Sequence, residues 1–296
     1  MMTALPSPVD RLLADVHAWP LFAGPAIHTR ALTASDDAEI FELWLAEERT
    51  VRPVVLERRA GADGTVLVFG ADTAAPVTVR RQRDAAPDAA PVEAAPDAPL
   101  VPAVRRVLAE LIESAALPGG HGAWVYTFED MVRTHGAAAE AYAFLRDLTH
   151  WPAALAHVDD VAWDEDEGGV QRVWTTVRAD DGARHRIPSL RILLGSSRVV
   201  YKPSSVPPIA RAHLGQWSVE QHAGSVTITG RHTVALDPVG IEKVLGPDAT
   251  VEAATRRVRG ALGKHSLDTL EAAKAHAENR LLSHDPALSW DRLGTS

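Results

Sequence analysis

The sequence predicts an α+β fold built from two copies of one unit, each a curved antiparallel sheet around a long helix. Three observations carry this prediction. Many short runs with strand character are separated by turns that contain glycine or aspartate. A long amphipathic stretch follows the second series of strands. A group of residues near the start of the chain recurs later with matching spacing. This order of elements predicts a cavity between sheet and helix.

The composition narrows the possible functions. The chain has 296 residues, of which 46% are hydrophobic, so it can bury a substantial core. A formal net charge of −9 gives no general attraction to phosphate and argues against a nucleic-acid partner. The absence of cysteine excludes disulfides, Cys–Zn sites and a thiol nucleophile. The sequence shows neither a signal-peptide pattern nor an apolar run of membrane-spanning length, so we expect a cytoplasmic protein without membrane contact.

The first series of elements begins with a short helix, expected at residues 8–15, whose apolar residues fall at helical spacing. Strands follow, which we expect at residues 26–33, 39–46, 51–58, 64–69 and 76–81. Residues 84–99 are almost entirely Ala, Pro, Asp and Glu, and this composition predicts a disordered or extended linker. An amphipathic helix is expected at residues 101–117, where Pro118-Gly119-Gly120 ends it.

The second series opens with a strand expected at residues 123–130 and a helix expected at residues 137–148. Six further strands are expected at residues 160–163, 170–178, 185–194, 198–202, 212–221 and 225–235. A long helix is expected from Thr250 to Leu282, because apolar residues keep one stripe along it and Thr250 is a suitable N-cap.

The two series indicate a tandem duplication. Residues 13–20, Leu-Ala-Asp-Val-His-Ala-Trp-Pro, align with residues 145–152, Leu-Arg-Asp-Leu-Thr-His-Trp-Pro. An arginine then follows each tryptophan at nearly the same distance, since Arg58 lies 39 residues after Trp19 and Arg191 lies 40 residues after Trp151. We therefore predict a degenerate N-terminal domain at residues 1–117, a complete C-terminal domain at residues 118–283 with the main pocket, and a tail at residues 284–296.

The second copy contains a strand face that suits a binding site. Because side chains alternate along a strand, His185, Ile187, Ser189 and Arg191 share one face. Two polar donors on that face, one of them a permanent cation, suit a pocket for a polar carbonyl compound. The alternative is an ordinary solvated strand face. The first copy keeps Arg58 but has Leu56 where Ser189 stands, so we expect the chemistry in the second copy.

The strand at residues 225–235 also alternates, and it places His232 on the apolar face beside Gly230, which leaves room for a ligand or a bulky neighbour. The alternative for His232 is a hydrogen-bonded core histidine. Trp217, on the preceding strand, is by default a core residue. The histidines do not form a metal-ligand pattern, and no Gly-rich phosphate or dinucleotide motif is present, so we expect a site without metal or cofactor.

Five segments of the second copy carry a resemblance to a known family; they are residues 185–191, 198–202, 212–217, 231–234 and 244–251. Together they resemble the C-terminal half of the didomain aromatase/cyclases of bacterial type II (aromatic) polyketide biosynthesis. The similarity runs from about Gly122 to Arg280, and the first copy is similar mainly near residues 13–22 and Arg58. The resemblance implies tandem START-like helix-grip domains of the SRPBCC superfamily.

The resemblance also implies an activity and partners. Members direct the regiospecific intramolecular aldol cyclisation and dehydration of the first ring of a poly-β-ketone that an acyl carrier protein delivers. The implied enzyme is a cofactor-independent, lyase-like aromatase that works with the other type II polyketide synthase components in antibiotic biosynthesis. The alternative is a non-catalytic START-like binding protein or chaperone for an apolar polyketide or lipid. A further alternative is that only the first half is inert.

The family's functional positions map onto particular residues here. Its pocket arginine and serine fall on Arg191 and Ser189, and its two tryptophans fall on Trp217 and Trp151. Related single-domain members have a tyrosine near Val158 and a tryptophan at Ile187, and this departure leaves His232 or His185 as the proton donor. The remaining residues that we expect to bind substrate are Trp174, Tyr201, Gly230 and Arg58.

Overall fold

The computed structural model describes residues 8–35, 38–47, 50–60, 66–70, 77–79, 92–94, 101–115, 121–179 and 182–284. The chain divides into two compact units, Met1–Val125 and Tyr126–Ser296. Each unit combines one antiparallel sheet with helices, so the predicted α+β class is confirmed. Among the described helices, none is long and apolar enough to cross a membrane.

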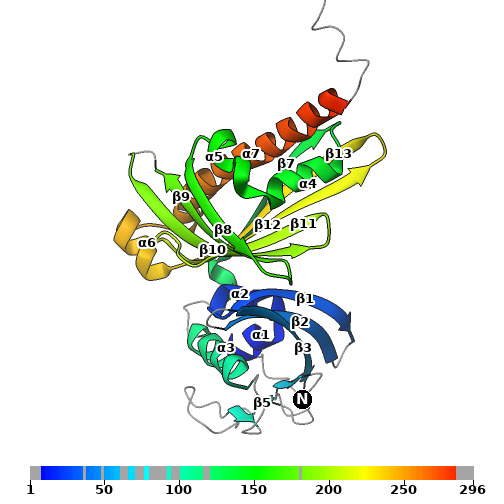
Figure 1. The fold of residues 1–296 in the computed structure, drawn as a ribbon. Helices are drawn as coiled ribbons and strands as arrows, with labels where there is room; N and C mark the ends of the chain where they lie inside the picture. The colour runs from blue at the N-terminus through cyan, green and yellow to red at the C-terminus, as the bar shows by residue number, and fades with distance from the viewer. Residues whose placement is uncertain are drawn as a thin grey trace, which may run out of the picture. The chain divides into compact units, whose positions relative to one another are not determined.

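The first unit is built on a six-stranded meander in which each strand pairs with the next along the chain. Its strands are β1 Ala26–Ala34, β2 Ala38–Glu47, β3 Thr50–Ala60, β4 Val66–Gly70, β5 Val77–Val79 and β6 Val92–Ala94. Its helices are α1 Pro8–Ala14, η1 Val16–Ala18, α2 Trp19–Phe22, α3 Val101–Ser114 and η2 His121–Trp124. Helix α3 buries its apolar stripe, including Val104, Leu108 and Leu111. Figure 1 shows this helix beside the sheet of the first unit.

One strand of the first unit lies where composition predicts a linker. Residues 92–94 form β6, which pairs antiparallel with β5 from Val77↔Ala94 to Val79↔Val92. The prediction of a disordered or extended linker was therefore wrong for these three residues, which belong to a sheet, because backbone pairing to a neighbouring strand needs no large apolar side chain. The rest of the segment 84–99 and the predicted tail beyond residue 284 lie outside the described residues.

The second unit has a seven-stranded antiparallel sheet in the order β7-β13-β12-β11-β10-β9-β8. Its strands are β7 Val125–Thr134, β8 Val158–Glu165, β9 Val170–Arg178, β10 Arg184–Leu194, β11 Arg198–Pro203, β12 Ala210–His222 and β13 Ser225–Leu236. Its helices are α4 Ala138–Arg146, η3 Leu148–His150, α5 Trp151–Ala154, α6 Pro238–Leu245 and α7 Val251–His284. Each predicted strand of this half has a counterpart within a few residues of its expected bounds.

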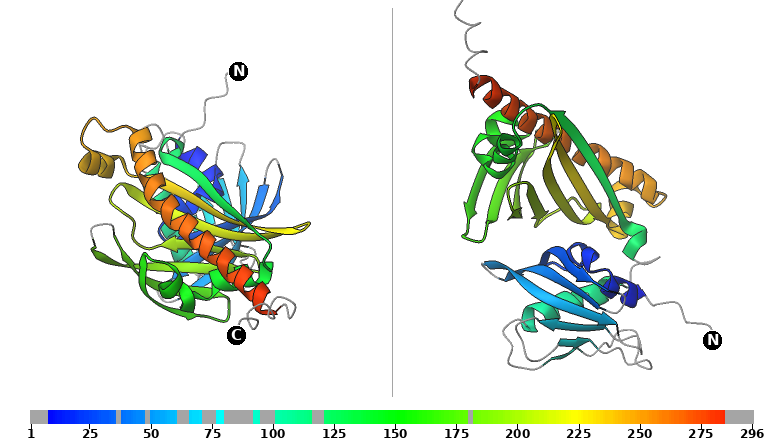
Figure 2. Two further views of the ribbon diagram at one scale, coloured as in Figure 1. Left: turned by 90° about the horizontal axis from the view of Figure 1, so that it is seen from above. Right: turned by 90° about the vertical axis from the view of Figure 1, so that its right-hand side faces the viewer.

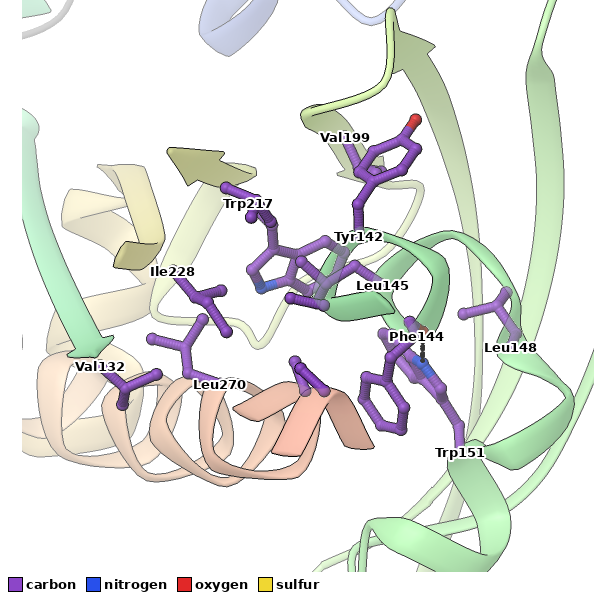
Figure 3. Close-up of a cluster of buried hydrophobic side chains, with 14 of the residues drawn as sticks. Val132, Tyr142, Phe144, Leu145, Leu148, Trp151, Val199, Trp217, Ile228 and Leu270 are labelled. Carbon is purple, nitrogen blue, oxygen red and sulfur yellow. Dashed lines mark hydrogen bonds between the residues drawn. The ribbon is translucent and has the colours of Figure 1, made fainter. Parts of the chain in front are cut away.

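The long helix α7 lies along one face of the second sheet (Figures 1 and 2). The Thr250 hydroxyl accepts a hydrogen bond from the Ala253 amide at 3.2 Å, which confirms the predicted N-cap. Leu270, Ala273 and Ala277 are fully buried in the core that α7 forms with α4 and the sheet (Figure 3). The helix-grip arrangement predicted from the order of elements is thus present in this unit.

Helix α6 has no counterpart among the predicted elements. Its start follows familiar chemistry, since Asp237 caps the helix by accepting from the Val239 amide at 3.2 Å, and Pro238 occupies the first turn. Gly240 is required there, because a β-carbon at this position would lie 1.7 Å from the Pro208 carbonyl oxygen. The signal was present in the sequence, but the segment is short, with eight residues.

The duplication is visible in one repeated contact. The Trp19 indole donates to the Leu12 carbonyl at 3.2 Å, and the Trp151 indole donates to the Phe144 carbonyl at 3.1 Å (Figure 3). Both bonds reach back seven residues, from a tryptophan at the start of a one-turn helix to the preceding helix. The aligned Trp-Pro pairs therefore perform the same structural task in both units.

Candidate active site

A row of register partners crosses the inner face of the second sheet and brings polar side chains from four strands together. The consecutive partners are Gln171, Arg191, Tyr201, Gly215 and His232, on β9, β10, β11, β12 and β13. Gln171, Arg191 and His232 are buried, with 1%, 3% and 3% of their surface exposed. Burial of three polar side chains in one row is unusual for a core and is typical of a functional site.

Arg191 is the centre of this row. Its guanidinium carbon lies 5.6 Å from the ring centroids of both Trp151 and Trp217. One terminal nitrogen, Nη2, donates to the Leu145 carbonyl, whereas Nε and Nη1 have no hydrogen-bond partner within the described chain. Burial lowers the pKa of Arg191 to about 9, so the side chain stays cationic at neutral pH. A buried cation with two free donors is costly unless it binds a ligand oxygen.

A second feature is a pair of buried histidines. His213 Nε2 lies 3.0 Å from His232 Nδ1, and the His232 ring stacks on Phe128 with centroids 4.8 Å apart. Burial lowers the pKa of His213 to about 3 and that of His232 to about 4, so both rings are neutral at neutral pH. One proton is therefore shared across the pair. Its position decides whether His232 Nε2 presents a proton or a lone pair to the interior.

Gly230 is where several polar groups converge. A β-carbon there would lie 2.8 Å from Ser266 Oγ, 3.6 Å from the Trp217 ring and 3.7 Å from His232 Nε2. Ser266 Oγ, Trp217 Nε1 and His232 Nε2 are buried and have no partner among the residues described. Buried polar atoms are normally hydrogen-bonded, so three such atoms around one glycine indicate a place for a polar ligand.

Tyr201 lies in the row between Arg191 and His232 and contacts the rings of both Trp217 and His232. Its ring stacks on Trp217 with centroids 4.3 Å apart and an interplanar angle of 22°. It also covers Gly215, where a β-carbon would lie 1.9 Å from the ring. Burial raises the pKa of Tyr201 above its usual value, so its hydroxyl is a neutral group.

The predicted residues of β10 and β8 differ in their distance from this centre. Ser189 and Ile187 are half-buried on the Arg191 face, two and four residues before it. His185 is exposed near the start of the strand, roughly 20 Å along the chain from Arg191 at about 3.3 Å per residue. Val158 is buried in the apolar core that also contains Trp151 and Trp217.

Trp174 and Arg58 have other surroundings than the row that contains Arg191. Trp174 follows the buried Val173 on β9, so it projects from the opposite face, where the Arg186 guanidinium lies 6.0 Å from its ring. Arg58 belongs to the first unit, where Nε and Nη2 both lie 3.4 Å from the Glu39 carboxylate. Its charge is therefore compensated inside that unit.

Sequence reasoning missed Gln171, His213 and Ser266. Their only local signal is inward alternation or helical spacing, which ordinary core residues share.

An open pocket of about 490 Å³ adjoins the row at its Gln171 end and is lined by Ala143, Arg146, Asp147, Thr149, Trp163, Glu165 and Gln171.

Comparison with known proteins places this geometry in context. No protein-family model matches the chain. It is 32% identical to the granaticin polyketide synthase bifunctional cyclase/dehydratase of Streptomyces violaceoruber, over 94% of this chain and 92% of that protein. It is 29% identical to the actinorhodin polyketide synthase bifunctional cyclase/dehydratase of Streptomyces coelicolor, over 90% of this chain and 91% of that protein.

Two solved structures are similar along nearly the whole chain. The di-domain ARO/CYC StfQ from the steffimycin biosynthetic pathway has a TM-score of 0.75 and 27% identity, covering 93% of this chain and 96% of that one. The di-domain ARO/CYC BexL from the BE-7585A biosynthetic pathway has a TM-score of 0.74 and 26% identity, covering 92% and 96%. The predicted tandem arrangement of two helix-grip domains agrees with both.

Proposed function

The chain belongs to the family of polyketide synthase bifunctional cyclase/dehydratases, and we propose that its second unit closes and aromatises the first ring of a poly-β-ketone. The enzyme works with components of a type II polyketide synthase. The substrate in this proposal is a chain attached to an acyl carrier protein. The observation that supports the site is Arg191, a buried cation beside two tryptophans with two unused donors.

Arg191 acts on oxygen in this proposal. Ring closure requires an enolate carbon to attack a ketone carbon, so negative charge moves onto the ketone oxygen as the carbon–carbon bond forms. Nε and Nη1 of Arg191 supply fixed donors for that oxygen, and a buried setting strengthens them. Arg191 does not exchange the protons, because a guanidinium remains protonated. Ser189, two residues earlier on the same face, shares the oxygen or relays a proton.

His232 moves the protons. It first accepts a proton through Nε2 from a methylene between two carbonyls, which generates the enolate. The same nitrogen returns this proton to the alkoxide that ring closure forms. In the dehydration it accepts the second proton of the same methylene carbon and delivers it to the hydroxyl, which leaves as water. The His213 contact at 3.0 Å supports this alternation, because a shift of the shared proton converts His232 from base to acid. His185 is a weaker candidate, since it is exposed and lies far along β10.

Trp217 and Trp151 restrict how the chain folds. Their rings meet edge to face with centroids 5.6 Å apart, and the Arg191 guanidinium lies 5.6 Å from each of them. A flexible poly-β-ketone has many pairs of carbons that can react, so holding one pair in contact decides which ring forms. Tyr201, stacked on Trp217, extends this surface.

Product analysis tests the proposal. A minimal type II polyketide synthase is incubated with the wild-type chain, with Arg191→Ala, and with Arg186→Ala as a control from the opposite face of β10. Wild type and the control are expected to give the correctly aromatised first ring, and Arg191→Ala is expected to give mainly misfolded shunt products. If Arg191→Ala leaves the product ratios unchanged while still binding the products, Arg191 does not direct ring formation and the proposed role of this site is wrong.

A further inference from the structure

Two arginines at matching positions of the duplicated units face different neighbours. Glu39 lies 20 residues after Trp19, and Gln171 lies 20 residues after Trp151. Glu39 is the register partner of Arg58, just as Gln171 is the register partner of Arg191. The first unit therefore pairs its arginine with a carboxylate, whereas the second unit places a neutral amide beside its arginine.

The orientation of the Gln171 amide follows from its hydrogen bonds. Its nitrogen Nε2 donates to Glu165 Oε2 at 2.7 Å and to the Arg146 carbonyl at 3.2 Å. Two acceptors on one side fix the nitrogen there. The oxygen Oε1 is buried and has no partner among the residues that the structure describes. Gln171 thus holds an unused acceptor in the row of Arg191.

The unused donors and the unused acceptor belong to register partners on two paired strands. Register partners on one face of an antiparallel pair have β-carbons about 5 Å apart. Nε and Nη1 of Arg191 can donate hydrogen bonds to an oxygen atom, and Oε1 of Gln171 can accept a hydrogen bond from that oxygen if it carries a hydrogen. A ketone or ether oxygen satisfies only the arginine. A hydroxyl group satisfies both residues at once.

We propose that Gln171 and Arg191 form one binding site for a hydroxyl group of the substrate, namely the enol of the polyketone or the alcohol produced by the aldol step. Gln171 is then the residue that selects the hydroxyl form over the ketone. This inference rests on the proposed function and adds a specificity-determining residue to it.

The first unit shows the effect that a carboxylate would have in place of the Gln171 amide. A carboxylate at position 171 would occupy the Arg191 donors through charge-assisted hydrogen bonds, as Glu39 occupies those of Arg58. The substrate oxygen would then compete with a tethered anion. The change from carboxylate to amide therefore accounts for a reactive arginine in one unit and a compensated arginine in the other.

Binding of a matched pair of probes tests the site. The probes are β-naphthol and its O-methyl ether, in which a methyl group replaces the hydroxyl proton. Dissociation constants are measured calorimetrically for wild type, Gln171→Met and the control Gln216→Met, where Gln216 lies on the opposite face of β12. Wild type and the control are expected to bind β-naphthol at least about tenfold more tightly than the ether. For Gln171→Met the ratio is expected to fall to about twofold or less.

A second variant tests the charge. Because Gln171 Nε2 faces Glu165, Gln171→Glu is combined with Glu165→Gln, which exchanges the two groups and preserves the net charge. This double variant is expected to lose at least about tenfold in affinity for β-naphthol. Thermal unfolding and circular dichroism confirm that each variant is folded.

The inference is overturned if wild type binds neither probe, if it binds both equally, or if Gln171→Met keeps the preference for β-naphthol. None of these results depends on turnover. Failure of the proposed function appears instead as an unchanged product ratio for Arg191→Ala, so the two failures are distinguishable.

Discussion

His213 Nε2 and His232 Nδ1 lie 3.0 Å apart inside the second unit, and burial keeps both rings neutral at neutral pH. Two neutral histidines in hydrogen-bond contact share one proton between the facing nitrogens. In the described structure, Nε2 of His232 is the one ring nitrogen of the pair that is buried without a hydrogen-bond partner. It lies beside Gly230, as Trp217 and Ser266 do, so it is the nitrogen that can exchange a proton with a ligand there. This arrangement suits a reaction that needs a base in one step and an acid in the next.

The histidine pair predicts how stability depends on pH. The folded-state pKa values, about 3 and about 4, lie below the unfolded value of 6.5. The unfolded state therefore binds more protons in this range, so the free energy of unfolding falls as the pH drops from about 6.5 to about 4. In His213→Leu this loss is expected to be smaller by about 2 kcal/mol. Urea unfolding across the range measures the difference, and parallel curves for wild type and variant would contradict it.

The two tryptophans beside Arg191 are expected to contribute differently to the free energy of unfolding of the protein. Trp151 and Trp217 are buried to nearly the same extent, with 8% and 7% exposure. Trp151 Nε1 donates to a carbonyl, whereas Trp217 Nε1 has no partner in the described chain. Trp151→Phe should therefore lower the free energy of unfolding by about 1 kcal/mol more than Trp217→Phe. Equal losses in urea unfolding would show that the indole bond is not a determinant of stability.

Position 215 is expected to need glycine because the Tyr201 ring leaves no room there for a side chain. Gly215 does not have a positive φ, so the backbone alone would accept alanine. A β-carbon there would instead meet the tyrosine ring at 1.9 Å. Gly215→Ala should cost about 1–3 kcal/mol of folding free energy. In a Tyr201→Ala background the same change should cost less than about 1 kcal/mol, and an equal cost in both backgrounds would refute the argument.

The local features of the fold were predictable from the sequence. The spacing from Trp19 to Arg58 and from Trp151 to Arg191 indicated the duplication, and the paired indole hydrogen bonds agree with it. Alternation placed His232 on an inner face, and His232 is indeed buried there. These inferences use only the periods of helices and strands, which a single segment displays by itself.

The composition of the site was less predictable, because it depends on register between strands that are far apart in the sequence. His213 lies 19 residues before His232 and meets it only through the β12–β13 pairing. Gln171 can be recognised as a site residue only from the β9–β10 pairing, which places it opposite Arg191. Trp174 is a different case, since alternation from the inward-facing Gln171 already assigns it to the other face of β9.

The central claim is that Arg191, and not its counterpart Arg58, stabilises the oxygen at which the ring closes. The most direct test compares single-turnover rates of first-ring formation for Arg191→Ala and Arg58→Ala in the full chain, with carrier-bound substrate from a minimal polyketide synthase. Loss of Arg191 is expected to slow ring formation by about 100-fold to 1,000-fold. Loss of Arg58 is expected to change it by less than about twofold, because Glu39 already compensates that charge. A larger loss for Arg58→Ala than for Arg191→Ala would contradict the account.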